Sequence, residues 1–256
     1  MEESFRRKGD FCWHCHTGIF AYPLRLAVSF NTPLVIYGEP QSYHSLYYNY
    51  DEFETEDSEK FDMIRTLGIS STDMLGMINQ RHEDKIELRD LEPYTFPDLD
   101  EFKKKKILPI NLGNYIEWDV KKQVDIIKST YGWKSDQLEG VPDQLNPFGG
   151  KIECYMQGTR DYIKFLKRGY SRISQNSAEL IRKGLLKTDQ AKKLIDIHEG
   201  EIPPSLEIFL DFIKMEKEEF YKICESMEVF PHKRDKTKNY KLAEKTSDYK
   251  EWFKEK

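Results

Sequence analysis

Residues 12–40 read CWHCHTGIFAYPLRLAVSFNTPLVIYGEP, and this stretch decides the fold. Its first part carries apolar residues at roughly helical spacing, which predicts a helix over residues 17–31 with Thr17 as its N-cap. The Asn-Thr-Pro sequence at 31–33 interrupts that helix, and the continuous apolar run at 34–37 predicts a short strand. A helix that leads directly into an apolar strand is typical of α/β proteins.

The carboxyl end of the predicted strand offers a candidate ligand site. Gly38, Glu39 and Pro40 follow the strand at once, and open α/β sheets bind their ligands beyond the carboxyl ends of the strands. The Glu39 carboxylate could hold a ligand hydroxyl or Mg²⁺, and the tyrosines of residues 42–50 could stack on a base or a sugar ring. The alternative is a turn followed by a half-buried aromatic cluster.

Composition restricts the class of protein. The 256 residues are 38% hydrophobic and 33% charged, with a mean hydropathy of −0.73, so we expect no membrane span. The 40 basic and 45 acidic residues are interspersed, and we therefore expect no nucleic-acid partner for the molecule as a whole. The first residues lack the apolar stretch of a secretory signal and the four cysteines form no disulfide framework, which predicts a cytoplasmic location.

The sequence pattern changes near residue 138. Residues 1–138 alternate between helix and strand, which predicts an α/β domain. Beyond the first helix and strand, this domain is expected to contain helical runs at 58–67 and 72–80, a strand at 107–112 and a helix from Asp119 that ends at Gly132. We expect residues 139–232 to form an all-helical domain, with helices at 153–170, 175–184, 188–198, 205–214 and 216–227. We expect residues 233–256 to form a mobile Lys-rich tail.

Cys12 and Cys15 form a C-x-x-C-H motif with His16, and His14 lies between them. The spacing suits two thiolate ligands to zinc, although a tetrahedral site needs two more ligands. Three roles remain open for this motif: the cysteines could be structural and line a site, they could bind a metal, or they could serve in redox chemistry or haem attachment. We name Cys12 and Cys15 as the candidate metal ligands.

The run from residue 152 to residue 172 concentrates positive charge on an amphipathic helix. Lys164, Lys167, Arg168 and Arg172 suit the binding of a phosphate or another anionic group. The alternative is a solvated helix surface. Gly158 and Gly169 each weaken a helix by about 1 kcal/mol relative to alanine, and such glycines often permit the close approach of another group.

Five blocks of the sequence together resemble the N-acetyl sugar amidotransferases of bacterial surface-glycan biosynthesis. They are CWHCHTGIFAYP, PLVIYGEP, LGNYIEWDVKKQV, YGWK and MQGTRDYIKFLKRGYSR, which occur in this order and span most of residues 10–232. The resemblance implies the pyrophosphatase-loop branch of the adenine nucleotide hydrolase folds, so the fold class we expect is α/β. A partial Rossmann-like parallel sheet would be followed by an all-helical carboxyl-terminal region.

The implied reaction converts a sugar acetamido group to an acetamidino group in lipopolysaccharide or other surface-glycan biosynthesis. It would use ATP and Mg²⁺, with Zn²⁺ as a further candidate, and ammonia from a partner glutaminase with its ammonia channel. The implied substrate is a nucleotide-linked or nonulosonic acetamido sugar, and a homo-oligomer is a candidate assembly. We assign nucleotide binding to Thr17, Gly18, Gly38 and Glu39, catalysis to Glu39, and sugar binding to the four basic residues named above.

The sequence departs from the family at one point. The phosphate-binding loop of the family, Ser-Gly-Gly-x-Asp-Ser, does not occur in this sequence, so these residues supply no such backbone cradle for pyrophosphate. We therefore expect the chain to be the carboxyl-terminal part of a longer enzyme, with residues 1–138 as the second half of its nucleotide-hydrolase-like domain. A non-catalytic docking subunit and a pyrophosphatase-loop relative that modifies tRNA are the alternatives.

Overall fold

The computed structural model describes two compact units, Met1–Asp119 and Val120–Lys256. The described residues are 1–38, 66–117, 119–135, 138–148, 154–230, 232, 237 and 240–243. Glu39, the tyrosine-rich segment 42–50, almost all of the predicted helical run 58–67 and most of the predicted tail lie outside them. The domain boundaries at 138 and 232 stay predictions. No helix in the described part of the chain is both long and apolar enough to cross a membrane.

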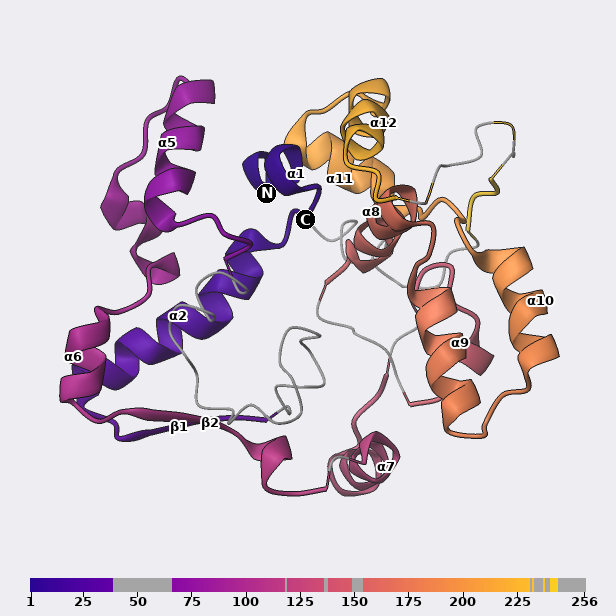
Figure 1. The fold of residues 1–256 in the computed structure, drawn as a ribbon, viewed down its shortest axis with the longest axis horizontal. Helices are drawn as coiled ribbons and strands as arrows, with labels where there is room; N and C mark the ends of the chain where they lie inside the picture. Colours follow the sequence, from indigo (N-terminus) through magenta and orange to yellow (C-terminus); the bar gives the residue numbers. More distant parts are fainter. Residues whose placement is uncertain are drawn as a thin grey trace. The chain divides into compact units, whose positions relative to one another are not determined.

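The first unit combines helices with a small parallel sheet (Figure 1). Its elements are α1 (Glu2–Lys8), α2 (Trp13–Phe30), β1 (Leu34–Tyr37), α5 (Ser71–Arg81), the 3-10 helix η1 (Leu88–Tyr94), α6 (Leu99–Lys104), β2 (Leu108–Asn111) and η2 (Leu112–Asn114). The predicted strands and the predicted helix at 72–80 are confirmed. The expected α/β class is confirmed as well.

Helix α2 begins four residues earlier than the sequence pattern predicted. Its N-cap is Cys12, whose side chain makes no capping hydrogen bond, so the usual capping signal is absent. Trp13 anchors the first turn instead, because its Nε1 donates a hydrogen bond of 2.9 Å to the carbonyl oxygen of Ile69. The prediction of Thr17 as the N-cap is therefore wrong, and Thr17 lies fully buried inside the helix. Asn31 ends α2 in the left-handed conformation, as expected.

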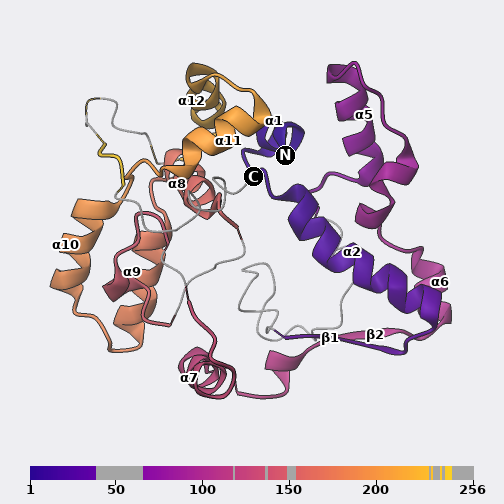
Figure 2. The ribbon, with the colours of Figure 1, turned by 180° about the vertical axis from the view of Figure 1, so that it is seen from behind.

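Strands β1 and β2 pair in parallel, with Leu34 opposite Leu108. Figure 2 shows the two strands side by side, with the carboxyl-terminal end of α2 close to where the strands begin. Val35 packs with the α2 residues Ala27 and Val28. Since side chains alternate along a strand, the neighbouring positions face the other way, and Leu34, Ile36 and Leu108 are 43%, 56% and 49% exposed. Parallel sheets normally have both faces covered.

The second unit is helical. It contains α7 (Val120–Tyr131), the 3-10 helix η3 (Asp143–Leu145), α8 (Gln157–Arg168), α9 (Arg172–Arg182), α10 (Thr188–His198), α11 (Ser205–Ile213) and α12 (Lys217–Ser226). Gly132 follows α7 with a φ of 64°, which confirms the predicted end of that helix. Gly169 is the C-cap of α8 with a φ of 76°, so the prediction that it lies inside a helix is wrong. One isolated bridge, between Ile202 and Leu242, is the only extended pairing among the described residues of this unit.

Two groups of apolar side chains hold the second unit together. Helix α8 packs against α11 and α12. Phe209 of α11 and Phe220 of α12 are fully buried, and their rings meet edge to face with centroids 6.4 Å apart. The other group joins α9 to the segment before α8 through Leu138, Val141, Leu145, Ile173 and Leu180. The amphipathic face of α8 is therefore fixed by packing, which determines where its polar face points.

Exposure of the apolar sheet face generates the first prediction. We expect the chain to self-associate, and Ile36→Lys to raise the monomer fraction, because a charge on an exposed strand opposes edge-to-edge pairing. The measurement is size-exclusion chromatography with light scattering. Ile197→Lys is the matched control, since Ile197 is 60% exposed on α10 and the change should leave association unaltered. A wild-type chain that is already monomeric at high concentration would contradict this expectation.

Candidate functional site

The basic side chains of α8 and the start of α9 lie close enough to repel one another. Burial lowers the pKa of Lys164, Asp161 partly offsets that effect, and the positive charges of Arg168, Arg172 and Arg160 lower it further. The Lys164 ammonium group also lies 4.9 Å above the ring of Tyr170, a favourable cation–π distance. We call Arg160, Lys164, Arg168 and Arg172 the cation cluster; the predicted residue Lys167 follows on the same helix.

The members of the cation cluster differ in what they contact. Arg172 is held by Asp161, with its Nε 2.7 Å and its Nη2 3.3 Å from the two carboxylate oxygens. Lys164 and Lys167 are half-buried, and the carbonyl oxygen of Lys167 accepts a hydrogen bond from the amide of Val229 at 2.7 Å. Arg168 is exposed. Of the four sugar-binding residues predicted from the sequence, Arg168 is therefore the best placed to meet a ligand from solvent.

A buried carboxylate lies where the amino-terminal ends of α8 and α11 meet. Glu139 Oε1 accepts a hydrogen bond of 3.1 Å from the amide of Ser205, the first residue of α11. The hydroxyl of Ser205 lies 2.9 Å from that of Thr159 and accepts a hydrogen bond of 3.2 Å from the Thr159 amide, in the first turn of α8. The positive ends of two helix dipoles thus face one buried negative group.

Gly158 allows Glu139 to approach α8 this closely. A Cβ atom at position 158 would overlap the Glu139 carboxylate and lie 2.9 Å from the Cβ of Pro203. The expectation that this glycine permits a close approach is confirmed, and the approaching group is a carboxylate of the same chain. Burial raises the pKa of Glu139, and its hydrogen bonds from Ser205 partly offset the shift.

The residues assigned to nucleotide binding lie in two places. Thr17 is fully buried, its hydroxyl has no hydrogen-bond partner among the described residues, and a Cβ at Gly18 would lie 3.2 Å from the ring of Tyr94. Gly38 follows the carboxyl end of β1, and a Cβ at this position would meet no described atom within 4 Å. Thr17 and Gly18 thus face the protein interior and η1, whereas Gly38 has room for a side chain within the described part of the chain. The assigned catalytic residue Glu39 lies outside the described residues.

Cys12 and Cys15 occupy the first turn of α2. Cys12 is buried at the N-cap, and its amide donates a hydrogen bond of 2.8 Å to Asp10. Cys15 is exposed, and its Sγ lies 3.3 Å from Nε2 of His14. Within the described residues, neither cysteine belongs to a group of three or more metal-ligating side chains. The assignment of these thiols as zinc ligands stays a prediction.

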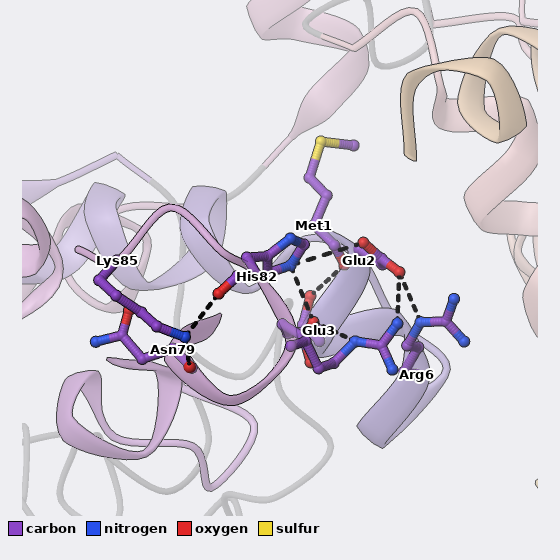
Figure 3. A network of polar contacts seen from close by, with 9 residues as sticks. Met1, Glu2, Glu3, Arg6, Asn79, His82 and Lys85 are labelled. Atoms are coloured by element: carbon purple, nitrogen blue, oxygen red, sulfur yellow. Dashed lines mark hydrogen bonds and ion pairs between the residues drawn. The ribbon is translucent and has the colours of Figure 1, made fainter. Parts of the chain in front are cut away.

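The structure brings together one group of potential ligands that the sequence pattern missed. Ligand atoms of Glu2, Glu3 and His82 lie within 4.8 Å of one another, and Figure 3 shows the His82 ring beside both carboxylates. Arg6 pairs with Glu2 at 2.7 Å, and Arg81 pairs with Glu3 at 2.8 Å. These arginines already neutralise the carboxylates, so we interpret the group as an ion-pair network that links α1 to α5. His82 is far in sequence from Glu2 and Glu3, so no spacing in the sequence pattern indicates the group.

Close packing at Gly158 generates the second prediction. We expect Gly158→Ala to lower the free energy of unfolding by about 1–3 kcal/mol, because the added methyl group overpacks a site already filled by Glu139 and Pro203. Gly76→Ala in α5 is the control: its Cβ would meet nothing within 4 Å, so the helix should gain about 0.5–1 kcal/mol. Both values come from urea unfolding. An unchanged stability for the position-158 variant would contradict the packing argument.

The raised pKa of Glu139 generates the third prediction. A carboxyl group whose pKa is higher in the folded state stabilises the protein below its unfolded pKa, and this contribution is lost as the pH rises through the folded pKa. We therefore expect Glu139→Gln to gain stability relative to the wild type between acid and neutral pH. The measurement is urea unfolding of both proteins across that range. If the free energies of unfolding of the two proteins change in parallel with pH, Glu139 has the same pKa in the folded and unfolded states, and the prediction is wrong.

Comparison with known proteins adds one finding. Residues 143–252 match the family described as "LPS biosynthesis protein WbpG-like, C-terminal domain". No curated protein matches the chain significantly. The matched segment contains α8 and α9, and therefore the whole cation cluster. Over residues 143–252, the chain is thus similar to a family of lipopolysaccharide biosynthesis proteins.

Proposed function

We propose that the chain takes part in an ATP-dependent amidotransferase reaction that converts a sugar acetamido group to an acetamidino group in lipopolysaccharide biosynthesis. The observation that carries this proposal is the cation cluster, which lies within the segment similar to a lipopolysaccharide biosynthesis family. The resemblance of the sequence blocks to N-acetyl sugar amidotransferases supports the reaction type. ATP, Mg²⁺ and a glutaminase that supplies ammonia belong to the proposal on the same ground.

The chemistry explains what such a protein must bind. An amide carbonyl is a poor electrophile, so its oxygen has to become a leaving group; transfer of AMP to that oxygen releases pyrophosphate, and ammonia then displaces AMP to leave the amidine. Positioning and charge neutralisation carry most of such a reaction. Thr17 and Gly18 face the interior in this structure, so we assign no step of nucleotide chemistry to them.

We assign the described part of the chain the binding of the sugar through its anionic group. Nucleotide-linked and nonulosonic sugars both carry negative charge, and an arginine can bind a phosphate or carboxylate through two parallel hydrogen bonds. Arg168 is exposed beside three further cations, whereas one nearby carboxylate, Asp161, is occupied by Arg172. The acetamido group would then be held at a fixed distance from the anchored anion.

The fourth prediction tests this assignment. In the complete enzyme, Arg168→Ala should weaken binding of the sugar substrate about ten- to a hundredfold and leave the dependence on ATP nearly unchanged, because a charge-assisted contact is worth about 1.5–3 kcal/mol. The measurement is steady-state kinetics in which a nucleoside-diphosphate N-acetyl sugar, a nonulosonic acetamido sugar and ATP are varied separately. Arg182→Ala is the control, since Arg182 is exposed at the end of α9.

If Arg168→Ala behaves like the Arg182 control toward both classes of sugar, the cation cluster is only a solvated surface and this assignment fails. A second candidate, a non-catalytic docking subunit, is favoured by the exposed apolar face of β1 and β2. The two differ in one measurement. A docking subunit would increase amidine formation by a catalytic partner. Substitutions in the cation cluster of the docking subunit would then leave the dependence of that reaction on the sugar concentration unchanged.

A further inference from the structure

We propose that a pocket between α1 and α5 binds a small sugar phosphate, with the phosphate group on Arg7 and Lys8 of α1 and the sugar hydroxyls on α5. The pocket has a volume of about 510 Å³, which is within the range of ligand pockets in proteins. The inference goes beyond the proposed amidotransferase reaction and does not rest on it, because every residue that it uses belongs to the first unit.

An ion-pair network fixes the two walls of the pocket relative to each other. Glu3, near the start of α1, pairs with Arg81 at the end of α5 at 2.8 Å. His82 Nε2 lies 3.3 Å from the Glu3 carboxylate (Figure 3). Arg7, at the other end of α1, lies close enough to Asp73 in the first turn of α5 for its charge to act on that carboxylate. The two helices therefore run antiparallel, and the end of α1 lies beside the start of α5.

The α1 side of the pocket is positive. Arg7 and Lys8 line it, and both residues are exposed. Arg7 forms no ion pair within the described part of the chain, so its guanidinium group is available to a ligand. A guanidinium group binds a phosphate through two parallel hydrogen bonds, and an ammonium group beside it adds a second positive charge. A phosphate group is therefore the ligand group that this side of the pocket suits best.

The α5 side of the pocket offers groups that suit hydroxyls. Ser70 donates hydrogen bonds to Asp73 Oδ2 from its amide at 3.0 Å and from its hydroxyl at 2.7 Å. These bonds, and to a smaller extent the charge of Arg7, lower the pKa of Asp73. Asp73 Oδ1 makes no hydrogen bond with a described residue, and the exposed residues Thr72 and Gln80 line the same side. A carboxylate, a hydroxyl and an amide together match the donors and acceptors of a sugar, and the negative charge disfavours a second anionic group here.

Gly76 keeps the middle of the pocket open. It lies inside α5 between Thr72 and Gln80, and a Cβ at this position would meet no described atom within 4 Å. Glycine weakens a helix by about 1 kcal/mol relative to alanine, and here neither a positive φ nor close packing requires it. Thr72 and Gln80 are eight residues apart, about 12 Å along the helix, and Ile69 and Met77 add apolar surface for the carbon atoms of a sugar ring. The pocket is therefore long enough for a phosphorylated sugar and too long for a phosphate ion alone.

The fifth prediction tests the pocket in the full chain. The titrations use a chain with the change Arg168→Ala, which removes the anion site proposed on α8, so the result does not depend on the amidotransferase assignment. Glucose 1-phosphate, inorganic phosphate and glucose are compared by isothermal titration calorimetry. We expect glucose 1-phosphate to bind at least tenfold more tightly than either of the other two, because it alone contacts both sides of the pocket.

Further changes in the same chain locate the site. Arg7→Gln should weaken the binding of glucose 1-phosphate and of inorganic phosphate about tenfold or more. Arg89→Gln is the matched control and should weaken neither, since the side chain of Arg89 is 77% exposed on η1. Asp73→Asn keeps an oxygen for Ser70 and should weaken glucose 1-phosphate severalfold without weakening inorganic phosphate. Gly76→Leu should abolish binding, because the leucine side chain fills the pocket.

Urea unfolding of each variant separates a lost contact from a lost fold. We expect Arg7→Gln and Gly76→Leu to leave the free energy of unfolding at or above that of the parent chain. The proposal is overturned if glucose 1-phosphate does not bind, if inorganic phosphate or glucose binds as tightly, or if Arg7→Gln leaves the affinity for glucose 1-phosphate unchanged.

Discussion

The second unit depends on one buried carboxyl group, that of Glu139. The Glu139 carboxylate contacts the amide that begins α11 and fits against Gly158 in the first turn of α8, so one group fixes the start of two helices. Burying a carboxylate costs free energy unless its oxygens are satisfied, and here two helix dipoles and one hydrogen bond supply part of the compensation. This contact fixes the first turn of α8, the helix that carries most of the cation cluster.

The cation cluster holds like charges close together on α8 and the start of α9, and Arg172 in it is paired with Asp161. Packing of α8 brings its cations together, and the lowered pKa of Lys164 reflects both its burial and their mutual repulsion. Asp161 is the one carboxylate that raises this pKa, and it is shared with Arg172. Like charges that serve only solubility have a lower electrostatic energy when they are spread over the surface than when they lie close together. A bound anion would relieve this repulsion, which is why we favour a ligand over a solvated face.

Sequence reasoning succeeded where local signals agreed and failed where distant contacts decided. Apolar periodicity predicted α2, α5 and α7 to α12, Asn31 and Gly132 predicted the ends of α2 and α7, and the short apolar runs predicted both strands, whereas α1 and α6 were not predicted. The start of α2 was missed because Trp13 fixes it through Ile69, a residue distant in sequence. The role of Gly158 was recognisable as a close approach, but its partner Glu139 was not, since the pairing arises only when α8 and α11 pack together.

The two units differ in how complete they are by themselves, and this difference bears on function. The second unit buries its aromatic core and carries the match to lipopolysaccharide biosynthesis proteins. The first unit leaves Leu34, Ile36 and Leu108 about half exposed on a two-stranded sheet. Covering each of these side chains would contribute on the order of 1 kcal/mol, so together they favour association with another surface. The carboxyl end of β1, where Gly38 has room for a side chain among the described residues, belongs to that same sheet. A surface that covered the sheet would therefore also help to build whatever site forms at the strand ends.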